Sequence, residues 1–500
     1  MAVFALLHNV TALPAQSKRY GLGPPRFPNN TSLPMLKMKR SSIISSVMQP
    51  NCKYSDSEET HFKSKALGSD MSTICLAIKE CAELGLFEDA IGIYIEMLSL
   101  GSHVYEFPCF PSLIKAFSEL RDLGKAKQVH EHVLKVGITE DVYVGNYLLT
   151  MYWKCGSVND GMDLFDRMPI RDTVSWNLVV SGFSRFMQPL SALETFSKMR
   201  DLGMMVDRIT SVSALSACAS CECLTFGRGI HAIVMKIGLD SDVSVSIGIV
   251  NMYMKCGDCP DAELAFTQAR IGNNTIACTA MISGYVYNKC PVEALTFFRK
   301  MLLLGVESDS STTVSTLVSC SHLADIDIGR QVHGYLITNG LLDDARVETT
   351  LLDMYCKCGN IEAGLRLFKQ LQSCNNVTWG AIITGCAQNS HPAEALELFT
   401  QFISQGGRVD SDILLSVLRA LSSITLKPQG IEVHSYSIRM GFVCDVFVGG
   451  ALADMYSKCG DIGSAQKVLL RLPKRDVVAW NALISGYIQN GYVDDALKAF

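Results

Sequence analysis

A six-residue phrase recurs four times at a nearly constant interval, and this internal period constrains the fold more than any other feature. The phrase reads MYWKCG from Met151, MYMKCG from Met252, MYCKCG from Met354 and MYSKCG from Met455, so successive copies begin 101, 102 and 101 residues apart. A chain of 500 residues would otherwise suggest about three globular domains. A fixed period instead predicts one array of similar units that stack along the chain.

Further landmarks follow the same interval. A histidine recurs at His130, His231, His333 and His434. A second phrase also recurs four times and reads SWNLVVSG in its first copy. The second residues of its four copies are Trp176, Cys278, Trp379 and Trp480. A third phrase, ALETFSKM in its first full copy, begins at Ala192, Ala294, Ala395 and Ala496, with a weaker copy at Ala90. These landmarks divide one period into the segments 173–207, 208–242 and 243–274, and each segment reads as two helices.

The segment that begins at Thr173 illustrates the helix signals. A mostly apolar stretch over Val174–Phe186 predicts its first helix, and Pro189 suits the first turn of a second helix. Ala192, Phe196 and Met199 follow at i, i+4 and i+7, which predicts one buried face.

Glycine then marks the helix ends, because the residue after a helix often needs a positive φ. The glycines predicted to end second helices at one equivalent place are Gly101, Gly203, Gly305 and Gly406. In the segment from 208, a stripe of Ile230, Val234 and Ile237 predicts the buried face of the second helix, which Gly238 closes.

The recurring MYxKCG phrase is predicted to be a helix end. Its Met and Tyr would face neighbouring helices, its Lys would suit the negative end of the helix dipole, and its Cys would fill a small apolar space. Its Gly would be the cap. Four copies therefore indicate four equivalent helix ends and not four active sites.

A two-helix unit of this size cannot bury its apolar face alone, whereas stacked units bury it against one another. The predicted fold is therefore all-α, a solenoid of helix-turn-helix repeats. Residues 71–500 accommodate thirteen units, and the last, which starts at Val477, is cut short at Phe500. No run of 18 apolar residues appears, which argues against a transmembrane helix.

The N-terminal segment differs from the array. Its first 55 residues contain seven Lys and Arg, no Asp or Glu, and several prolines, a composition typical of an organellar transit peptide; a merely disordered basic tail is the alternative. We expect the leader to cover residues 1–65 and to direct the chain to a mitochondrion or a chloroplast, with a slight preference for the plastid because residues 1–17 carry no Lys or Arg. The remaining 445 residues hold 37 basic and 49 acidic side chains, a formal charge of −12, which argues against indiscriminate phosphate binding.

Several cysteines and histidines have spacings that could suit metal or catalytic sites. The 19 cysteines are expected to be free thiols. The clusters Cys218-x-x-Cys221-x-Cys223 and Cys256-x-x-Cys259 have ligand-like spacing, but neither has a matching partner pair nearby, so no metal is expected. The recurring histidines are expected to be structural, and the recurring tryptophans to be core residues before they are stacking platforms.

Taken together, the phrases resemble the pentatricopeptide repeat family of plants, and in particular its P-L-S subclass of ordinary, long and short motifs. The stretch VSWNLVVSG followed by ALETFSKM resembles the ordinary motif, ACASCECLTFGRGIHAIVMKIG the long motif, and MYWKCG followed by LFDRMPIRD the short motif. The resemblance covers residues 71–500. It implies a right-handed α-solenoid that binds single-stranded organellar RNA, with repeats that each read one base through two or three side chains.

In that family the base depends on the fifth residue of a motif and on its last residue. The resemblance implies uracil for Asn146 with Asp172 and for Asn177 with Asp207, guanine for Thr279 with Asp309, and adenine for Thr349 with Asn375. Asn481 takes the fifth place in the last unit. Independently of the family, a short amide or hydroxyl can pair with a base edge, and such a contact discriminates by roughly 1–3 kcal/mol.

Other units depart from this pattern. The first motif is degenerate and has Cys75 at its fifth place. The other fifth residues have no side chain that can hydrogen-bond a base, and they are Pro111, Val212, Ile247, Val314, Gly380, Leu415 and Gly450. The third to ninth motifs would then read U-U-n-n-G-n-A from 5′ to 3′. Stacking on flanking apolar side chains could add roughly 1–3 kcal/mol per base.

Enzyme signatures are absent from the 500 residues, including GxxxxGK[ST], GxSxG and HExxH. The His-x-Glu of zinc deaminases is also missing, although His391-Pro-Ala-Glu394 comes within one residue of it. We therefore expect no catalysis and no cofactor within these 500 residues. The resemblance implies that the chain recognises a site for cytidine-to-uridine RNA editing, with a deaminase-like domain beyond Phe500 or with partner proteins of an editing complex. The alternatives are transcript stabilisation, splicing or processing, or a protein-binding scaffold.

Overall fold

The computed structural model describes residues 71–99, 110–137, 141–371, 374–472 and 477–500. Throughout these ranges the regular structure is helical, in agreement with the predicted fold class. The predicted leader and Gly101 lie outside the described residues. None of the helices in the described part of the chain is both long and apolar enough to cross a membrane.

The chain divides into two compact units. The first unit is described from residue 71 to Ile271. Its helices are α2 (Met71–Glu83), α3 (Phe87–Ser99), α4 (Phe110–Leu120), α5 (Leu123–Val136), α6 (Val142–Lys154), α7 (Val158–Arg167), α8 (Thr173–Arg185), α9 (Pro189–Asp201), α10 (Arg208–Ser220), α11 (Leu224–Ile237), α12 (Val243–Lys255) and α13 (Cys259–Gln268).

The second unit is described over Gly272–Phe500. Its helices are α14 (Thr275–Tyr287), α15 (Pro291–Leu303), α16 (Ser310–Leu323), α17 (Ile326–Thr338), α18 (Ala345–Lys357), α19 (Ile361–Gln370), α20 (Asn376–Gln388), α21 (Pro392–Ser404), α22 (Ser411–Ile424), α23 (Lys427–Arg439), α24 (Val446–Lys458), α25 (Ile462–Arg471), α26 (Val477–Gln489) and α27 (Val493–Ala499). Two short 3₁₀ turns, η4 (Leu341–Asp343) and η5 (Phe442–Cys444), precede α18 and α24.

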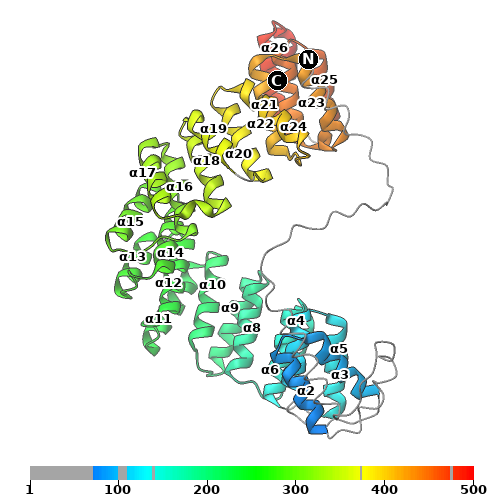
Figure 1. The fold of residues 1–500 in the computed structure, drawn as a ribbon, viewed down its shortest axis with the longest axis vertical. Coiled ribbons are helices and arrows are strands. Elements are labelled where there is room, and N and C mark those ends of the chain that lie inside the picture. Colours follow the sequence, from blue (N-terminus) through cyan, green and yellow to red (C-terminus); the bar gives the residue numbers. More distant parts are fainter. Residues whose placement is uncertain (1–70, 100–109, 138–140, 372–373, 473–476) are drawn as a thin grey trace, which may run out of the picture. The chain divides into compact units, whose positions relative to one another are not determined.

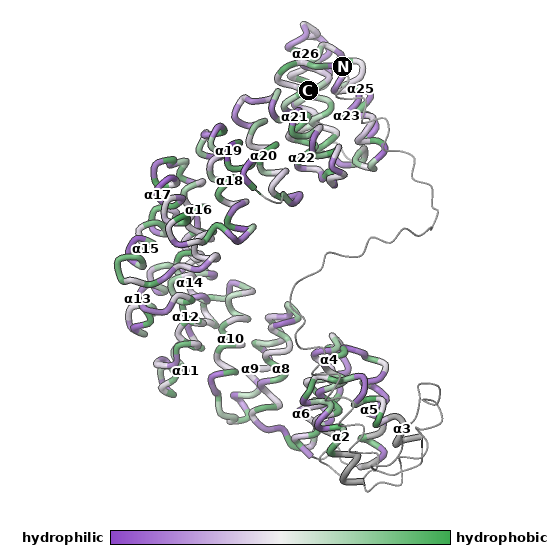
Figure 2. The backbone as a smooth tube through the Cα atoms, viewed as in Figure 1, coloured by the Kyte–Doolittle hydropathy of each residue, from purple (hydrophilic) through white to green (hydrophobic). Residues whose placement is uncertain are grey.

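Within each unit the helices form a solenoid of two layers. The first helices of successive motifs pack against one another, from α4 through α6, α8 and α10 to α12 in one unit and from α14 through the even-numbered helices to α26 in the other. Each second helix packs on its own first helix, and within each unit it also contacts the first helix that follows. Hydrophobic and hydrophilic residues alternate along these helices (Figure 2), as expected for two-helix units that bury one face of each helix. The stacked helix pairs of Figure 1 therefore confirm the predicted α-solenoid.

The predicted helix faces are largely buried. Ala192, Phe196 and Met199 are fully buried on α9, as are Ile230 and Val234 on α11. The prediction for Ile237 was wrong, because this side chain is 47% exposed. It is the last residue of α11, directly before Gly238, whose φ of 75° turns the chain away, so no further helical turn covers it.

The MYxKCG phrase ends the first helix of a motif, as predicted. Its glycines adopt positive φ values of 79°, 82°, 79° and 78° at Gly156, Gly257, Gly359 and Gly460. Its methionines are fully buried, at Met151, Met252, Met354 and Met455. In three copies the methionine lies against a glycine of the preceding second helix, and a Cβ on that glycine would come within 2.3–2.4 Å of the methionine sulfur.

The tyrosine of the phrase explains the recurring histidine. Histidine Nδ1 and tyrosine Oη lie 2.7, 2.9, 2.7 and 2.9 Å apart in the pairs His130–Tyr152, His231–Tyr253, His333–Tyr355 and His434–Tyr456. Burial lowers the pKa of each histidine and raises the pKa of Tyr152 and Tyr456 to about 12. These pairs join a long motif's second helix to the next first helix, which confirms the structural interpretation.

The recurring tryptophans belong to the core in two of three copies. Trp176 packs edge-on against Phe165, and Trp379 packs in the same way against Phe368, with ring centroids 4.9 and 4.7 Å apart. Trp480 is only partly buried against the same core. Cys278, which replaces a tryptophan, is buried.

Candidate nucleic-acid interface

The two asparagine pairs predicted to read uracil meet in space. Asn146 Nδ2 donates to Asp172 Oδ1 at 3.1 Å, and Asn177 Nδ2 donates to Asp207 Oδ2 at 2.7 Å. Each asparagine is buried on a first helix, α6 or α8, and each aspartate begins the next first helix, α8 or α10. The structure therefore joins residues 26 and 30 positions apart into single sites.

The threonine pairs are also brought together, with one difference. Thr279 Oγ1 lies 3.4 Å from Asp309 Oδ1, a long contact. Thr349 and Asn375 are instead linked through Thr378, whose hydroxyl lies 3.0 Å from Thr349 Oγ1 and 3.0 Å from Asn375 Oδ1. The remaining predicted residue, Asn481, lies exposed on α26.

The last residues of the motifs have a structural role that the sequence interpretation missed. Each motif-final residue from Asp141 to Asp445 is the N-cap of the next first helix and accepts a hydrogen bond from a backbone N–H there, whether or not a polar fifth residue accompanies it. These caps are Asp141, Asp172, Asp207, Asp242, Asn274, Asp309, Asp344, Asn375, Asp410 and Asp445. Helix capping alone is thus enough to explain a motif-final Asp or Asn, so whether a motif reads a base has to be judged first from its fifth residue.

Two cap geometries separate the motifs. The caps after long motifs, Asp141, Asp242, Asp344 and Asp445, have ψ values of 118°, 123°, 115° and 121° and accept from the N–H two residues ahead at 2.7–2.9 Å. The caps of the four candidate pairs, Asp172, Asp207, Asp309 and Asn375, have ψ values of 179°, −175°, 175° and 172° and accept from the N–H three residues ahead at 2.7–2.9 Å. Asp410 has the same extended geometry, with a ψ of 177°, although the fifth residue of its motif is Gly380, so this geometry accompanies the candidate pairs without depending on them.

Hydrogen-bond polarity distinguishes the two threonine sites. Thr279 and Thr349 each donate their hydroxyl proton to the carbonyl four residues earlier at 2.8 Å, so each oxygen is left as an acceptor. Asp309 adds a carboxylate, which only accepts. The backbone N–H of Thr378 donates to Asn375 at 2.9 Å, which identifies that atom as Oδ1 and leaves Nδ2 to donate outward. One site therefore presents two acceptors, and the other presents an acceptor and a donor.

The carboxylates of the uracil pairs stay ionised. Burial opposes ionisation of Asp172 and of Asp207, but hydrogen bonds from the backbone N–H groups and side chains of Ser175 and Thr210, and from the two asparagines, outweigh it. The pKa of each aspartate is therefore lower than its ordinary value.

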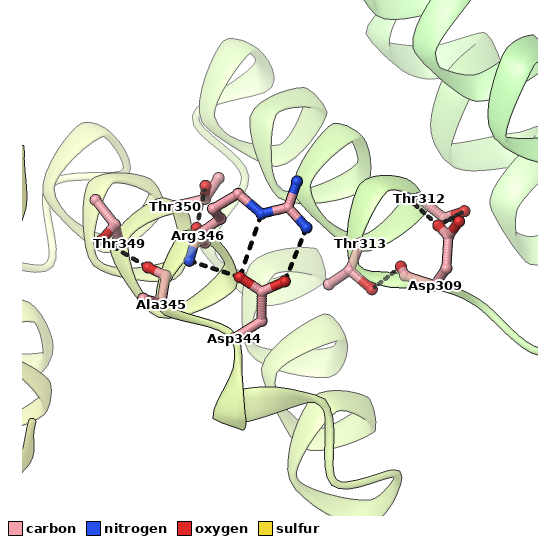
Figure 3. A network of polar contacts seen from close by, with 8 residues as sticks. All are labelled: Asp309, Thr312, Thr313, Asp344, Ala345, Arg346, Thr349 and Thr350. Carbon is pink, nitrogen blue, oxygen red and sulfur yellow. Dashed lines mark hydrogen bonds and ion pairs between the residues drawn. The ribbon is translucent and has the colours of Figure 1, made fainter. Parts of the chain in front are cut away.

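Exposed apolar side chains beside the caps are candidate contacts that the sequence interpretation did not name. The second residue of a motif is apolar and more than half exposed at Tyr143, Val174, Ile209, Ile276, Val377 and Phe447. An apolar residue recurs at the second place of these first helices, and this pattern in the sequence could have identified the residues as candidate contacts. Arg346 stands at this place in one motif and forms a two-pronged ion pair with Asp344, at 2.9 and 3.3 Å (Figure 3).

The cysteine clusters show ordinary packing contacts. Cys256 Sγ lies 3.9 Å from the Cys218 carbonyl oxygen and 3.9 Å from Met252 Sδ, and burial raises the pKa of Cys218 and of Cys256. Among the described residues, no group of three or more His, Cys, Asp or Glu side chains is arranged to hold a metal ion.

Comparison with known sequences gives consistent matches. The family described as PPR repeat matches residues 75–102, 146–172, 174–204, 276–306, 349–376, 377–407 and 478–500. Two chloroplast pentatricopeptide repeat-containing proteins of Arabidopsis thaliana are 32% and 35% identical over 452 and 422 residues, which cover 90% and 84% of this chain but 55% and 48% of the relatives. A third is 30% identical, over 83% of this chain and 67% of its own length. This chain spans about half the length of the first two relatives.

Solved structures show the same fold. The crystal structure of the pentatricopeptide repeat protein PPR10 from maize is similar over 94% of this chain and 66% of that protein, with a TM-score of 0.60 and 17% identity. PPR10 in complex with an 18-nt psaJ RNA element gives a TM-score of 0.59 with 18% identity. At these identities the similarity shows the fold alone.

Proposed function

Because the chain belongs to the pentatricopeptide repeat family, we propose that it is an organellar, sequence-selective single-stranded RNA-binding protein. One observation carries the proposal: at four places a polar fifth residue on a first helix lies beside the cap of the next first helix. Helix capping does not need such a partner. Asp410 caps α22 although the fifth residue of its motif is Gly380, which has no side chain. The paired polar groups are therefore available for recognition.

The polarity of the sites supports the proposed bases. Guanine offers N–H groups at N1 and N2 on its Watson–Crick edge, which matches the two acceptors of Thr279 and Asp309. Adenine offers a donor at N6 and an acceptor at N1, which matches Thr349 Oγ1 and Asn375 Nδ2. Asn146 and Asn177 each keep one amide N–H beyond the one given to aspartate, and this N–H can donate to a uracil carbonyl.

Affinity would come from stacking and from base-edge contacts more than from phosphate neutralisation, because residues 56–500 carry a formal charge of −12. The exposed second residues, such as Val174 and Ile276, flank the fifth residues on the same first helices and can cover the faces of bases. Base stacking of this kind contributes roughly 1–3 kcal/mol per base.

Within RNA biology, the proposed role is recognition of a site for cytidine-to-uridine editing, with catalysis supplied by partner proteins or by a deaminase-like domain outside these 500 residues. The support is the resemblance of the motifs over residues 71–500 to the P-L-S order, in which the caps after the long motifs share ψ values of 115–123°. Chloroplast relatives support an organellar location, in a plastid or a mitochondrion.

The test is fluorescence anisotropy of the purified protein with a short RNA that carries U-U-n-n-G-n-A, compared with the same RNA with G changed to U. Thr279→Asn is measured in parallel. We expect the wild type to prefer G and the variant to prefer U at that nucleotide. Equal binding of both RNAs by the wild type, or no binding at moderate salt, would refute base reading and favour a protein-binding scaffold.

A further inference from the structure

A third residue contacts both members of every candidate pair. It is the third residue of the following motif, and it carries a hydroxyl at Ser175, Thr210, Thr312 and Thr378. Each of these side chains is at least 97% buried, so RNA cannot touch it. Each is nevertheless within hydrogen-bond distance of the fifth residue and of the cap.

The distances are similar at all four sites. Ser175 Oγ lies 2.6 Å from Asn146 Oδ1 and 2.9 Å from Asp172 Oδ1. Thr210 Oγ1 bonds Asn177 Oδ1 and lies 2.8 Å from Asp207 Oδ1. Thr312 Oγ1 lies 2.6 Å from Thr279 Oγ1 and 2.8 Å from Asp309 Oδ1, the second of which Figure 3 shows. Thr378 completes the set with its two 3.0 Å contacts.

The hydroxyl is present only where the preceding motif has a polar fifth residue. After the motifs with Pro111, Val212, Ile247, Val314, Gly380, Leu415 and Gly450 at the fifth place, the third residues are Val144, Val245, Ala277, Val347, Ile413, Val448 and Ala479. Helix capping does not require the hydroxyl, since Asp410 accepts from the backbone N–H of Ile413 at 2.9 Å. The hydroxyl therefore accompanies the polar fifth residue and not the cap.

Proton accounting shows what the hydroxyl does at an asparagine site. The single proton of Thr210 has two acceptors within reach, Asn177 Oδ1 and Asp207 Oδ1, while Asn177 Nδ2 donates to Asp207 Oδ2. A reversed amide would place its oxygen against a carboxylate oxygen, which is repulsive. The hydroxyl and the carboxylate together hold the amide in one orientation, so that its second N–H faces outward as a donor.

We infer that the buried hydroxyl at the third place of the following motif is a positioning residue for base reading, and that each reading site consists of three residues from two motifs. This inference rests on the proposed function. It gives the chain a rule: a polar fifth residue reads a base with full selectivity only when the next motif supplies Ser or Thr at its third place.

The first test removes one hydroxyl. Thr210→Val is expected to lower the preference for U over C at the nucleotide read by Asn177 by roughly fivefold to tenfold, the effect of one lost hydrogen bond. The preference at the neighbouring nucleotide, read by Asn146, serves as the internal control for folding and is expected to stay unchanged. Thr210→Ser restores the hydroxyl and is expected to restore the preference, and Val245→Thr is the matched control at a motif that reads no base.

The second test builds a reading site. Asp410 already has the extended cap geometry, with ψ of 177°, and a Cβ on Gly380 would lie 3.4 Å from Ile413 Cγ1. Gly380→Asn together with Ile413→Thr is expected to create a preference for U directly 3′ of the adenine nucleotide, at least fivefold above Gly380→Asn alone.

The outcomes separate the two proposals. If the wild type shows no preference for U over C at the nucleotide of Asn177, the proposed function fails and this inference fails with it. If the wild type discriminates and Thr210→Val discriminates equally well, or if Gly380→Asn alone reads as well as the double variant, only the third-residue rule is overturned.

Discussion

The sites of Thr279 and Thr349 form a natural matched pair, because they share their fifth and third residues and differ in the cap alone. Asp309→Asn should therefore convert the guanine site into an adenine site. The backbone N–H of Thr312 now donates to Asp309 Oδ1 at 2.7 Å, and it would hold the asparagine Oδ1 in the same way, which turns Nδ2 outward. An acceptor that matches guanine becomes a donor that matches adenine.

The magnitude follows from one hydrogen bond lost and one gained. Each good pairing contributes roughly 1–3 kcal/mol of discrimination, so the ratio of affinities for the G and A forms of the RNA should move by at least about tenfold. Stability should stay within a few tenths of a kcal/mol, because Asn and Asp cap helices about equally well. A change in melting temperature would therefore not explain the altered preference.

The assay is anisotropy with U-U-n-n-G-n-A and with U-U-n-n-A-n-A, for the wild type, Asp309→Asn and the reciprocal Asn375→Asp, which should gain a preference for G at the last nucleotide. If Asp309→Asn still prefers G and gains no affinity for A, the assignment of donors and acceptors at these caps is wrong.

Three further perturbations separate structural from recognition roles. Asp410→Ala removes a cap with no polar fifth residue, so urea unfolding should show a loss of about 1 kcal/mol while base preference stays as it was; an altered preference would contradict the capping role. Val174→Ser changes an exposed side chain, so RNA affinity should fall by roughly 1–3 kcal/mol at an unchanged melting temperature, and equal affinity would exclude stacking there. Burial lowers the pKa of His333 below its ordinary value of 6.5, so below about pH 6.5 the unfolded chain binds a proton first and stability should fall until the folded-state pKa is passed; His333→Gln should flatten this slope in melting curves recorded from pH 7.5 to 5.5, and an unchanged slope would show that His333 does not titrate as described.

The sequence predicted the features that depend on local pattern. The period, the helix ends at MYxKCG and the buried face of α9 follow from spacing and from the special conformations of glycine and proline. The pairing of Asn177 with Asp207 was also expected, although only through the family resemblance. These predictions succeed because a repeated local pattern has to pack in the same way in each copy.

The remaining features depend on contacts between motifs, which a reading of single motifs does not include. The pairing of His333 with Tyr355 joins two motifs, and so does the contact of Thr210 with Asn177. Ile237 was predicted to be buried from its spacing, but whether a neighbour covers the last turn of a helix depends on the path of the following chain. The capping role of the motif-final residues was missed because the same residues already had an interpretation as base-reading groups.

The shared use of the cap has a consequence for how such a chain can change its target over generations. Asp and Asn codons differ by a single base, as do those for Thr and Asn, and Asp309 can exchange for Asn at almost no cost to helix capping. Selection for a stable solenoid therefore hardly acts on the exchange of Asp309 for Asn, although this substitution would alter which RNA is bound. Whole families of stable variants with different targets would lie one point mutation apart, which makes specificity at these positions free to drift while the scaffold is kept.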